Sequence, residues 1–243
     1  MQYHLDTIPV WEAMEQHNEC PLCVLSRKAE ATEIERSLGG SVMEPESRIR
    51  VNEQGICRMH HHSLFLQQNR LGHALLTDSH AKEVLKKLSI LTPTATKNKL
   101  FFRKSAASPT TWLAQKLESL IRGCVICEAI ETHVNRYLYT FIYLWKKDSK
   151  FKALWESSKA ICIPHAIQLL RSAAKQLSPE QEEAFAQSLL SLLQSALCTD
   201  EKDLEWFTLK FDYRNQDKPW GNSKDALERT VNLLRGYGQK EEK

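Results

Sequence analysis

The feature that most constrains this chain is a cysteine and histidine motif that occurs twice. Each copy consists of a CxxC sequence followed, 33 or 34 residues later, by a CxxH sequence. The first copy contains Cys20, Cys23, Cys57 and His60, and the second contains Cys124, Cys127, Cys162 and His165. Six of the seven cysteines of the chain belong to this pattern. The repetition argues against two accidental cysteine pairs and for a shared chemical role.

Three thiolates and one imidazole are the ligands of a Cys3His zinc site. Two ligands separated by two residues can reach one ion from a single turn, and a second such pair completes the tetrahedron. Four protein ligands leave no open position for water, which is typical of structural zinc. Each short sequence precedes a helical pattern, so backbone N–H groups near its cysteines favour thiolate over thiol. The motif therefore predicts two Zn²⁺ ions per chain, one for each copy.

The order of the four short sequences along the chain does not fix how they pair in space. We expect each copy to form its own site, because the intervening residues suffice for a helix outward, a turn and a helix back to the same end. Cys20 and Cys23 could instead join Cys162 and His165 across the duplication. A binuclear arrangement is a further alternative.

Two other chemistries compete with zinc for these cysteines. A CxxC sequence at a helix N-terminus lowers the pKa of its thiols and suits redox chemistry, but a thioredoxin-type site needs a βαβ context that the sequence lacks. An iron–sulfur cluster usually takes four cysteines rather than three cysteines and a histidine. Zinc is therefore favoured, and an iron–sulfur cluster is the lesser alternative.

The other histidines and the seventh cysteine suggest no further site. Either His61 or His62 could replace His60 as a ligand, but the alignment with His165 favours His60. Cys198 has no partner and is expected to be an inert, buried thiol. The sequence contains no Gly-rich phosphate loop, no GxSxG and no HExxH. No catalytic residue can be named, so we expect a protein that is not an enzyme, with an enzyme that uses a cleft between the halves kept as an alternative.

Helix start and stop signals dominate the chain, and no segment shows the alternation of a strand. Only 8 glycines and 8 prolines occur in 243 residues. Residues 125–146 keep their apolar side chains at helical spacing, and the sequence SPEQ at 178–181 is a capping box. Other helices are expected over 8–17, over 58–76, from Asp78 or Ser79 to Pro93, from Thr110 or Thr111 to Gly123, after Asp148, and from Asn222 or Ser223 to Gly236. We therefore predict an all-α helical bundle of about ten helices, built from two diverged repeats that are each stapled by a Cys3His metal site.

The two repeats are expected at 1–91 and 111–243, the second with a C-terminal helical extension. Residues 92–110 are rich in Ser, Thr and Pro and read as a linker, although the halves could also pack as one domain. From 82 to 104 the chain has seven basic residues and one acidic residue. A solvated connector explains this charge better than a nucleic-acid surface with Phe101 and Phe102 stacked on bases, since a charge cluster alone is weak evidence.

A second polar stretch, KFDYRNQDKPWG at 210–221, connects two expected helices. We expect a loop whose aromatic side chains pack on the bundle while Asp212 or Asp217 pairs with Arg214. The alternative is a binding surface, because aromatic residues and arginine are the types that dominate protein interfaces.

The longest apolar run, at 137–145, has nine residues, whereas a membrane-spanning helix needs about 20. We therefore expect no membrane association. The N-terminal segment has neither a basic region nor an apolar region of the kind that directs secretion. The expected location is the cytoplasm, where a reducing environment favours metal binding by clustered cysteines over disulfides.

Several segments resemble an uncharacterised family of bacterial, Firmicutes-type, cytoplasmic proteins that carry a domain of unknown function. They are YHLDTIPVWEA at 3–13, CPLC at 20–23, SVMEPESRIRVNEQGIC at 41–57, NRLGHALL at 69–76, KFDYR at 210–214 and DKPWG at 217–221. The chain departs from the family pattern at Ile56, where Phe is more common; Ile56 is not a ligand. Some relatives are labelled as ABC-transporter substrate-binding proteins, a label that the missing export signal argues against. The resemblance implies a bacterial cytosolic protein and no established activity.

These observations favour a non-enzymatic zinc-binding helical protein that acts as a scaffold or regulatory interaction protein for a protein partner. The alternative is a zinc-thiolate redox sensor, or a thiol oxidoreductase, that uses the CxxC pairs. A nucleic-acid partner bound through residues 82–104 is the less favoured choice.

Overall fold

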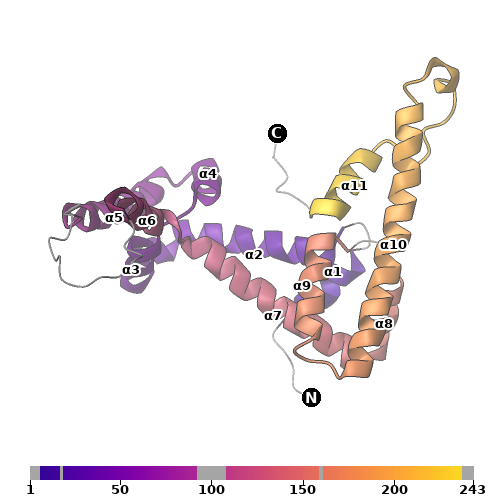
Figure 1. The fold of residues 1–243 in the computed structure, drawn as a ribbon, viewed down its shortest axis with the longest axis horizontal. Coiled ribbons are helices and arrows are strands. Elements are labelled where there is room, and N and C mark those ends of the chain that lie inside the picture. The colour runs from indigo at the N-terminus through magenta and orange to yellow at the C-terminus, as the bar shows by residue number, and fades with distance from the viewer. Residues whose placement is uncertain (1–5, 17–18, 92–107, 159–160, 237–243) are drawn as a thin grey trace. The chain divides into compact units, whose positions relative to one another are not determined.

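The protein is all-helical in the part of the chain that the structure describes. This structure, a computed structural model, describes residues 6–16, 19–91, 108–158 and 161–236. Within these ranges there are eleven α-helices, two short 3₁₀ helices and no strand, which confirms the predicted fold class (Figure 1). No helix in these ranges is both long and apolar enough to cross a bilayer.

The helical elements are numbered in the order of the chain. They are α1 (Thr7–Glu15), α2 (Pro21–Leu38), η1 (Gly40–Met43), α3 (Pro45–Gln54), α4 (Arg58–Leu66), α5 (Arg70–Ser89), α6 (Pro109–Ile121), α7 (Val125–Lys147), α8 (Ser149–Glu156), α9 (Ile163–Ala173), α10 (Pro179–Leu209), η2 (Tyr213–Asn215) and α11 (Ala226–Arg235).

Side-chain caps explain where several helices begin. The capping box at Ser178 is present with both of its hydrogen bonds, and Asp148 accepts from the backbone N–H groups of the first turn of α8. Both were predicted from the sequence. Ser108, rather than Thr110 or Thr111, caps α6.

Other helix boundaries differ from the prediction. The helix expected over 58–76 is two helices, because Asn69 caps a new helix by accepting from the backbone N–H of Gly72 at 2.8 Å. That helix, α5, runs through Asp78 and Ser79, which were expected to open another helix. The polar segment 45–54, for which no helix was predicted, forms α3. The last helix begins at Ala226.

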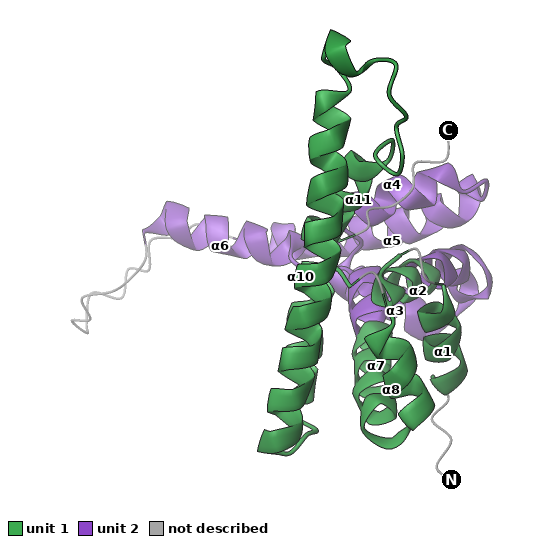
Figure 2. Cartoon of the chain, turned by 90° about the vertical axis from the view of Figure 1, so that its right-hand side faces the viewer, with its two compact units in different colours: residues 1–29, 132–243 green, residues 30–131 purple. Residues whose placement is uncertain are grey.

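The chain forms two compact units, and each is described here by itself. Unit 1 contains residues 1–29 and 132–243, and unit 2 contains residues 30–131 (Figure 2). The chain passes from one unit to the other within α2 and again within α7. This division differs from the expected repeats at 1–91 and 111–243. Residues 92–107 of the expected linker lie outside the described residues, so the two repeats and their linker stay a prediction.

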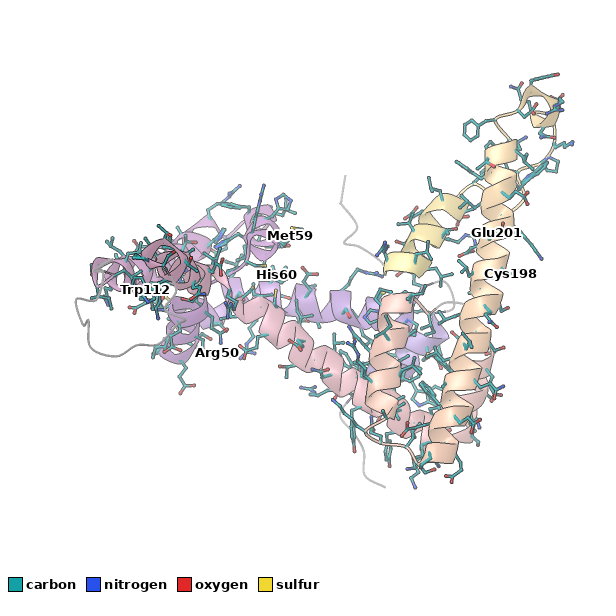
Figure 3. All side chains as sticks on the ribbon, viewed as in Figure 1. Arg50, Met59, His60, Trp112, Cys198 and Glu201 are labelled. Atoms are coloured by element: carbon teal, nitrogen blue, oxygen red, sulfur yellow. The ribbon has the colours of Figure 1, made fainter. Side chains whose placement is uncertain are left out.

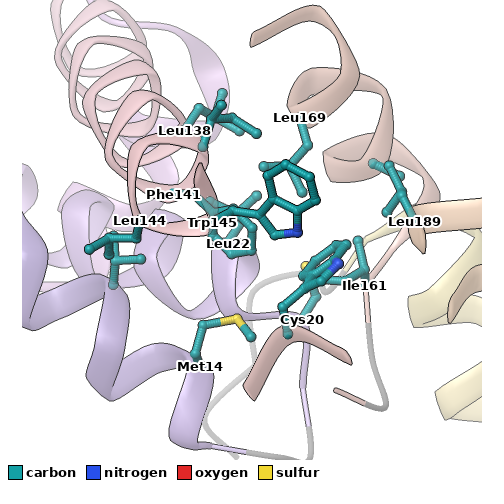
Figure 4. Close-up of a cluster of buried hydrophobic side chains, with 14 of the residues drawn as sticks. Met14, Cys20, Leu22, Leu138, Phe141, Leu144, Trp145, Ile161, Leu169 and Leu189 are labelled. Carbon is teal, nitrogen blue, oxygen red and sulfur yellow. The ribbon is translucent and has the colours of Figure 1, made fainter. Parts of the chain in front are cut away.

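The core of unit 1 is built around aromatic side chains of α7, α8 and α10. Phe141 meets Phe151 and Trp155 edge to face at centroid distances of 5.1 and 5.3 Å, and Trp155 stacks on Phe185 at 5.6 Å. Such aromatic pairs stabilise a core beyond their buried area. The fully buried Cys20 belongs to the same cluster of side chains (Figure 4).

Unit 2 has a smaller, aliphatic core. It is formed by Ile34, Leu38, Val42, Val51, Leu64, Leu76, Cys124, Val125 and Ile126. Here, too, a cysteine of the motif lies within the hydrophobic cluster. The ligand-type residues of both units are therefore positioned by packing of their neighbours.

The loop between α10 and α11 is held together by a buried lysine. The ammonium group of Lys210 donates to the carbonyl oxygens of residues 215, 216 and 218 at 2.7, 2.8 and 2.6 Å. Asp212 pairs with Arg214, as expected. Of the aromatic side chains of this loop, Phe211 and Trp220 contact Phe207 of α10 at centroid distances of 5.4 and 5.9 Å, as expected, whereas Tyr213 is 79% exposed.

Candidate metal centres

The structure brings the eight predicted ligands together in two groups of four. The unit-1 cluster consists of Cys20, Cys23, Cys162 and His165, and the unit-2 cluster consists of Cys57, His60, Cys124 and Cys127. In each cluster the four ligand atoms lie within 4.8 Å of one another. Each cluster takes its CxxC sequence from one copy of the motif and its CxxH sequence from the other. The expected pairing within each copy is therefore wrong, and the pairing across the duplication is the one observed.

Helix lengths explain this cross-pairing. At 1.5 Å per residue, the 18 residues of α2 carry the chain about 27 Å away from its CxxC sequence, while the 10 residues of α3 can return only about 15 Å. In the second copy, the 23 residues of α7 extend about 35 Å and the 8 residues of α8 about 12 Å. Neither return helix is long enough to bring a CxxH sequence back to the CxxC sequence of its own copy.

Each short sequence lies at the N-terminus of a helix. A cysteine stands immediately before each of these helices: Cys20 before α2, Cys57 before α4, Cys124 before α7 and Cys162 before α9. The carbonyl oxygen of each of these cysteines accepts the first backbone hydrogen bond of the helix that follows, at 2.9 to 3.1 Å. The second ligand follows within the first turn, so both ligands of a pair lie beside the N–H groups that the helix leaves without partners. These groups and the helix dipole stabilise negatively charged thiolates.

In the unit-1 cluster the imidazole lies against all three sulfur atoms. The Nδ1 atom of His165 is 3.5 Å from Cys20 Sγ, 3.2 Å from Cys23 Sγ and 3.1 Å from Cys162 Sγ. The Sγ atoms of Cys23 and Cys162 are 3.6 Å apart. The two motif halves that meet here are separated by about 140 residues of chain.

The unit-2 cluster repeats this geometry. The Nδ1 atom of His60 is 3.3 Å from the Sγ atoms of Cys57 and Cys124 and 3.4 Å from Cys127 Sγ. The Sγ atoms of Cys57 and Cys127 are 3.8 Å apart. His60 lies on α4, at the start of that helix (Figure 3).

These spacings fit a tetrahedral metal ion. Zinc bonds of about 2.3 Å to sulfur and about 2.05 Å to nitrogen place two sulfurs about 3.8 Å apart, and a sulfur and a nitrogen about 3.6 Å apart. The observed sulfur–sulfur distances are 3.6 and 3.8 Å, and the sulfur–nitrogen distances are 3.1 to 3.5 Å. All seven cysteines are free thiols. The two Cys3His clusters are therefore compatible with a metal ion such as zinc.

The second imidazole nitrogen has a different partner in each cluster. In unit 2 the Nε2 atom of His60 lies 3.3 Å from the Oε1 atom of Glu30. In unit 1 the Nε2 atom of His165 lies 3.5 Å from the hydroxyl of Ser26, which itself donates to the carbonyl of Leu22 at 2.7 Å. Both contacts leave Nδ1 directed at the sulfurs, which is how metal-ligating histidines are usually oriented.

Charge in the unit-2 cluster is shared between a thiolate and an imidazolium. Hydrogen bonds to Cys124 and to Glu30 raise the pKa of His60 to about 10. Burial raises the pKa of Cys124, but its hydrogen bonds, above all to His60, outweigh this and lower the pKa to about 6. Burial and the hydrogen bond to Cys124 raise the pKa of Cys127 to about 12. Only a cation at the centre would allow His60 and Cys127 to lose their protons near neutral pH.

The unit-1 cluster shows the same competition between its sulfurs. Burial raises the pKa of Cys20, but hydrogen bonds with Cys162, Cys23 and His165 outweigh burial and hold it well below its ordinary value. Hydrogen bonds with Cys20 and then with Cys23 raise the pKa of Cys162. Three sulfurs this close again call for a shared positive charge.

Close backbone contacts hold the two ligand turns of unit 2 together. The N–H of Val125 donates to the carbonyl of Gly55 at 3.1 Å. A Cβ atom on Gly123 would lie 2.7 Å from the carbonyl oxygen of Gln54, closer than real Cβ contacts, so this position needs glycine. The segments that precede the two ligand pairs therefore lie side by side through protein contacts alone.

The remaining candidates lie outside both clusters. His61, the alternative ligand to His60, is half-buried, and its Nδ1 atom lies 2.8 Å from Nε2 of the buried His73. Burial lowers the pKa of both imidazoles. Cys198, expected to be buried, is exposed on α10 (Figure 3). The roles of Ser26 and Glu30 were missed, although their positions one and two helical turns after Cys23 on α2, respectively, could have suggested them.

Comparison with known proteins places the whole chain in one family. The model of a protein family described as a family of unknown function, DUF6062, matches residues 1–241. No curated protein and no solved structure matches the chain. A functional argument therefore has to start from the two clusters.

Proposed function

Because the chain belongs to a family of unknown function, we propose its function from the two Cys3His clusters. Each cluster binds one Zn²⁺ ion, and the two ions act as structural cross-links in a non-enzymatic helical scaffold protein. The observation that carries this proposal is the spacing of the ligand atoms in each cluster, with distances of 3.1 to 3.8 Å that are close to the edges of a zinc tetrahedron. Four protein ligands leave no position for a catalytic water.

The nested order of the ligands supports a role in stability. The unit-1 ion would link residues as far apart as Cys20 and His165, and the unit-2 ion would link Cys57 and Cys127 inside that span. In the chain-entropy model, a cross-link removes about 5 kcal/mol of chain entropy from the unfolded state for the unit-1 span of 145 residues and about 4 kcal/mol for the unit-2 span of 70 residues. Structural zinc in small domains contributes about 10–16 kcal/mol of binding free energy to folding. Each ion would therefore stabilise contacts between residues that are far apart in the chain, which helix formation alone does not bring together.

A protein is the proposed partner of this scaffold. On α9, Ile163, Ile167 and Leu170 are 36% to 44% exposed at helical spacing, directly after the ligand Cys162. The zinc ion would therefore fix the orientation of an exposed apolar stripe, a surface suited to protein contact rather than to nucleic acid.

The basic segment 82–104 gives less support to a nucleic-acid partner. In its described part, Lys82 pairs with Asp78 at 2.7 Å and Lys86 pairs with Glu83 at 3.3 Å. These acidic neighbours compensate two of the charges that would have to contact phosphates. Residues 92–107 lie outside the described part of the chain. We also propose that the protein is bacterial and works in the cytoplasm, where clustered thiols stay reduced and available to metal.

Metal content tests the proposal. We expect elemental analysis of the anaerobically purified full chain to give about two zinc ions per chain, and a strong chelator to reduce helical circular dichroism as the metal leaves. If the analysis instead found iron, and the protein absorbed visible light, the clusters would be assigned as iron–sulfur sites rather than zinc sites. A metal-free chain with full helicity and a cooperative thermal transition would overturn the structural role.

One observation favours the redox alternative, and it concerns a single cluster. The thiol of Cys127 is exposed, whereas the three thiols of the unit-1 cluster are buried. The redox alternative therefore applies, if anywhere, to the unit-2 cluster.

A further inference from the structure

The two clusters differ in how far their sulfur atoms are accessible. In unit 1, Cys20 and Cys162 are 0% exposed and Cys23 is 3% exposed. In unit 2, Cys127 is exposed and Cys57 is half-buried. A thiolate reacts with an oxidant only where the oxidant can reach it, so equal ligand sets here do not imply equal reactivity.

The end of α11 covers the unit-1 sulfurs. A Cβ atom built on Gly236, the residue that ends α11, would lie 3.8 Å from Cys162 Sγ and 4.0 Å from Cys23 Sγ. All three cysteines also belong to the hydrophobic core of unit 1. The core and the end of α11 therefore shield the unit-1 thiolates.

We propose that the unit-2 cluster is an oxidant-responsive metal site, in which a peroxide modifies Cys127 first and Cys57 then closes a disulfide with it. This inference rests on the proposed zinc sites and adds a second role to one of them. The unit-1 ion stays bound throughout, so oxidation releases metal from the unit-2 cluster alone.

The geometry selects Cys57 as the partner of Cys127. Their sulfurs are 3.8 Å apart and need to approach to about 2.05 Å, a movement of about 0.9 Å for each. Cys124, by contrast, is one of the buried residues of the unit-2 core, so packing resists displacement of its sulfur. The disulfide would join the first turns of α4 and α7.

The chemistry balances with one peroxide molecule. The thiolate of Cys127 attacks a peroxide oxygen, which gives a sulfenic acid and one hydroxide ion. The thiolate of Cys57 then attacks the sulfenic sulfur, which forms the disulfide and expels a second hydroxide. The two sulfurs lose two electrons in total, and the peroxide gains them. Zn²⁺ keeps only His60 and Cys124 as protein ligands and leaves the site.

The contact with Glu30 makes these thiolates better nucleophiles. A Zn²⁺ ion with three thiolates and one imidazole carries a net charge of −1. The Oε1 atom of Glu30, 3.3 Å from Nε2 of His60, makes the imidazole a stronger donor to the metal. The sulfur atoms then keep more electron density than in unit 1, where the Nε2 atom of His165 faces the neutral hydroxyl of Ser26.

The experiment is a hydrogen peroxide titration of the zinc-loaded full chain. It uses the C198S background, because Cys198 is exposed and lies in neither cluster. A chromogenic zinc indicator follows release, and peptide mapping by mass spectrometry identifies the disulfide. We expect release of one of the two zinc ions together with a Cys57–Cys127 disulfide, and recovery of the metal after treatment with dithiothreitol and zinc.

Two matched variants locate the reactive thiol. Cys127→His and Cys23→His each leave a Cys2His2 set, which is itself a common zinc set. Peroxide-driven release should disappear in the first variant and stay unchanged in the second. If either variant fails to load zinc, the disulfide map of the C198S chain decides the question alone.

Each remaining outcome contradicts a defined part of the proposal. Release of both ions at the same rate would overturn the selectivity of unit 2. A Cys124–Cys127 disulfide would overturn the assignment of Cys57. A chain with two bound zinc ions that resists peroxide would overturn only this inference, whereas a chain that binds no metal would overturn the proposed function as well.

Discussion

The Nε2 atom of His60 lies 3.3 Å from the Oε1 atom of Glu30, while Nδ1 of the same ring faces three sulfurs. One imidazole thus joins a carboxylate to the centre of the unit-2 cluster. The carboxylate fixes the ring orientation and the tautomer, and it raises the basicity of the nitrogen that would bind metal. In unit 1 the corresponding contact of His165 is to Ser26, a neutral hydroxyl.

The first prediction concerns this carboxylate. Glu30→Gln keeps an oxygen acceptor beside Nε2 but removes its charge, so we expect the zinc affinity of the unit-2 cluster to fall about 10- to 100-fold. Competition with a chelator of known affinity measures the loss for each site. Glu35→Gln, an exposed position on the same helix, is the matched control and should change neither site. Equal loss at both clusters would contradict the assignment of Glu30 to one of them.

The hydroxyl in unit 1 should matter less. Ser26→Ala removes a neutral and longer contact, because the Oγ–Nε2 distance is 3.5 Å. We therefore expect a loss of less than about 10-fold in the zinc affinity of the unit-1 cluster. The same competition assay compares the two substitutions. If Ser26→Ala lowered the affinity more than Glu30→Gln, the negative charge of Glu30 would not be what the contact at the histidine Nε2 atom contributes to zinc binding.

Proton release follows from the pKa values of the unit-2 cluster. Between pH 7 and 9 the metal-free cluster keeps a proton on His60, whose pKa is about 10, and one on Cys127, whose pKa is about 12. Both groups must lose these protons to bind zinc. We therefore expect at least two protons released per ion at this site, and an affinity that rises about 100-fold or more per pH unit.

Calorimetry in buffers of different ionisation enthalpy counts these protons. Loading the unit-2 site of a Cys162→Ser chain isolates its contribution, because that substitution removes a ligand of the other cluster. Release of fewer than two protons per ion would mean that His60 or Cys127 does not bind the metal.

Much of the local structure could be predicted from short patterns. The capping box at Ser178 and the cap at Asp148 depend on side chains within three residues, so the sequence displays them directly. α3 was missed because it is polar on nearly every side and only Val51 is buried, which leaves no apolar period. Its Pro45 at the start and Gly55 at the end are nonetheless the signals that could have found it.

The pairing of the ligands could not be predicted from the sequence in the same way. Which CxxH sequence meets which CxxC sequence depends on the difference in length between the outgoing and returning helices. That difference rests on helix ends at Leu38 and Gln54, and helix ends are the least certain part of a sequence-based assignment. The eight ligand types were apparent because the motif repeats; their grouping required the fold.

Double substitutions distinguish the two possible pairings. Cys20→Ser with Cys162→Ser removes two ligands of one cluster, so the chain should keep one metal ion. Cys20→Ser with Cys57→Ser removes one ligand from each cluster, so we expect both sites to lose tight binding. Elemental analysis after gel filtration measures the ions that remain. The opposite result, with more metal in the second variant, would restore the pairing within each copy of the motif.

A further structural relationship lies between α10 and α11, where Arg229 meets three carboxylates. Its guanidinium contacts Asp200 and lies 2.8 Å from Asp203 and 3.1 Å from Asp225. It also donates to the backbone carbonyl of Asn222 at 2.8 Å. Burial raises the pKa of Asp200 despite the opposing charge of Arg229. The arginine therefore holds together acidic groups that would otherwise repel one another.

The last prediction is that Arg229→Gln destabilises unit 1 by about 1–3 kcal/mol at pH 7, because it leaves these carboxylates without a cation. Without Arg229 the pKa of Asp200, which burial already raises, should lie further above its value in the unfolded chain, so stability is lost as pH increases through the folded value and is recovered on acidification. The difference in unfolding free energy from the parent chain should thus be smaller near pH 4, about the ordinary pKa of aspartate, than at pH 7. Urea unfolding of the variant and the parent chain, compared at each pH with the same total zinc, measures this difference. Arg214→Gln removes an arginine from an exposed pair and should cause no measurable change, so an equal effect of both substitutions would show that the Arg229 contacts add nothing specific.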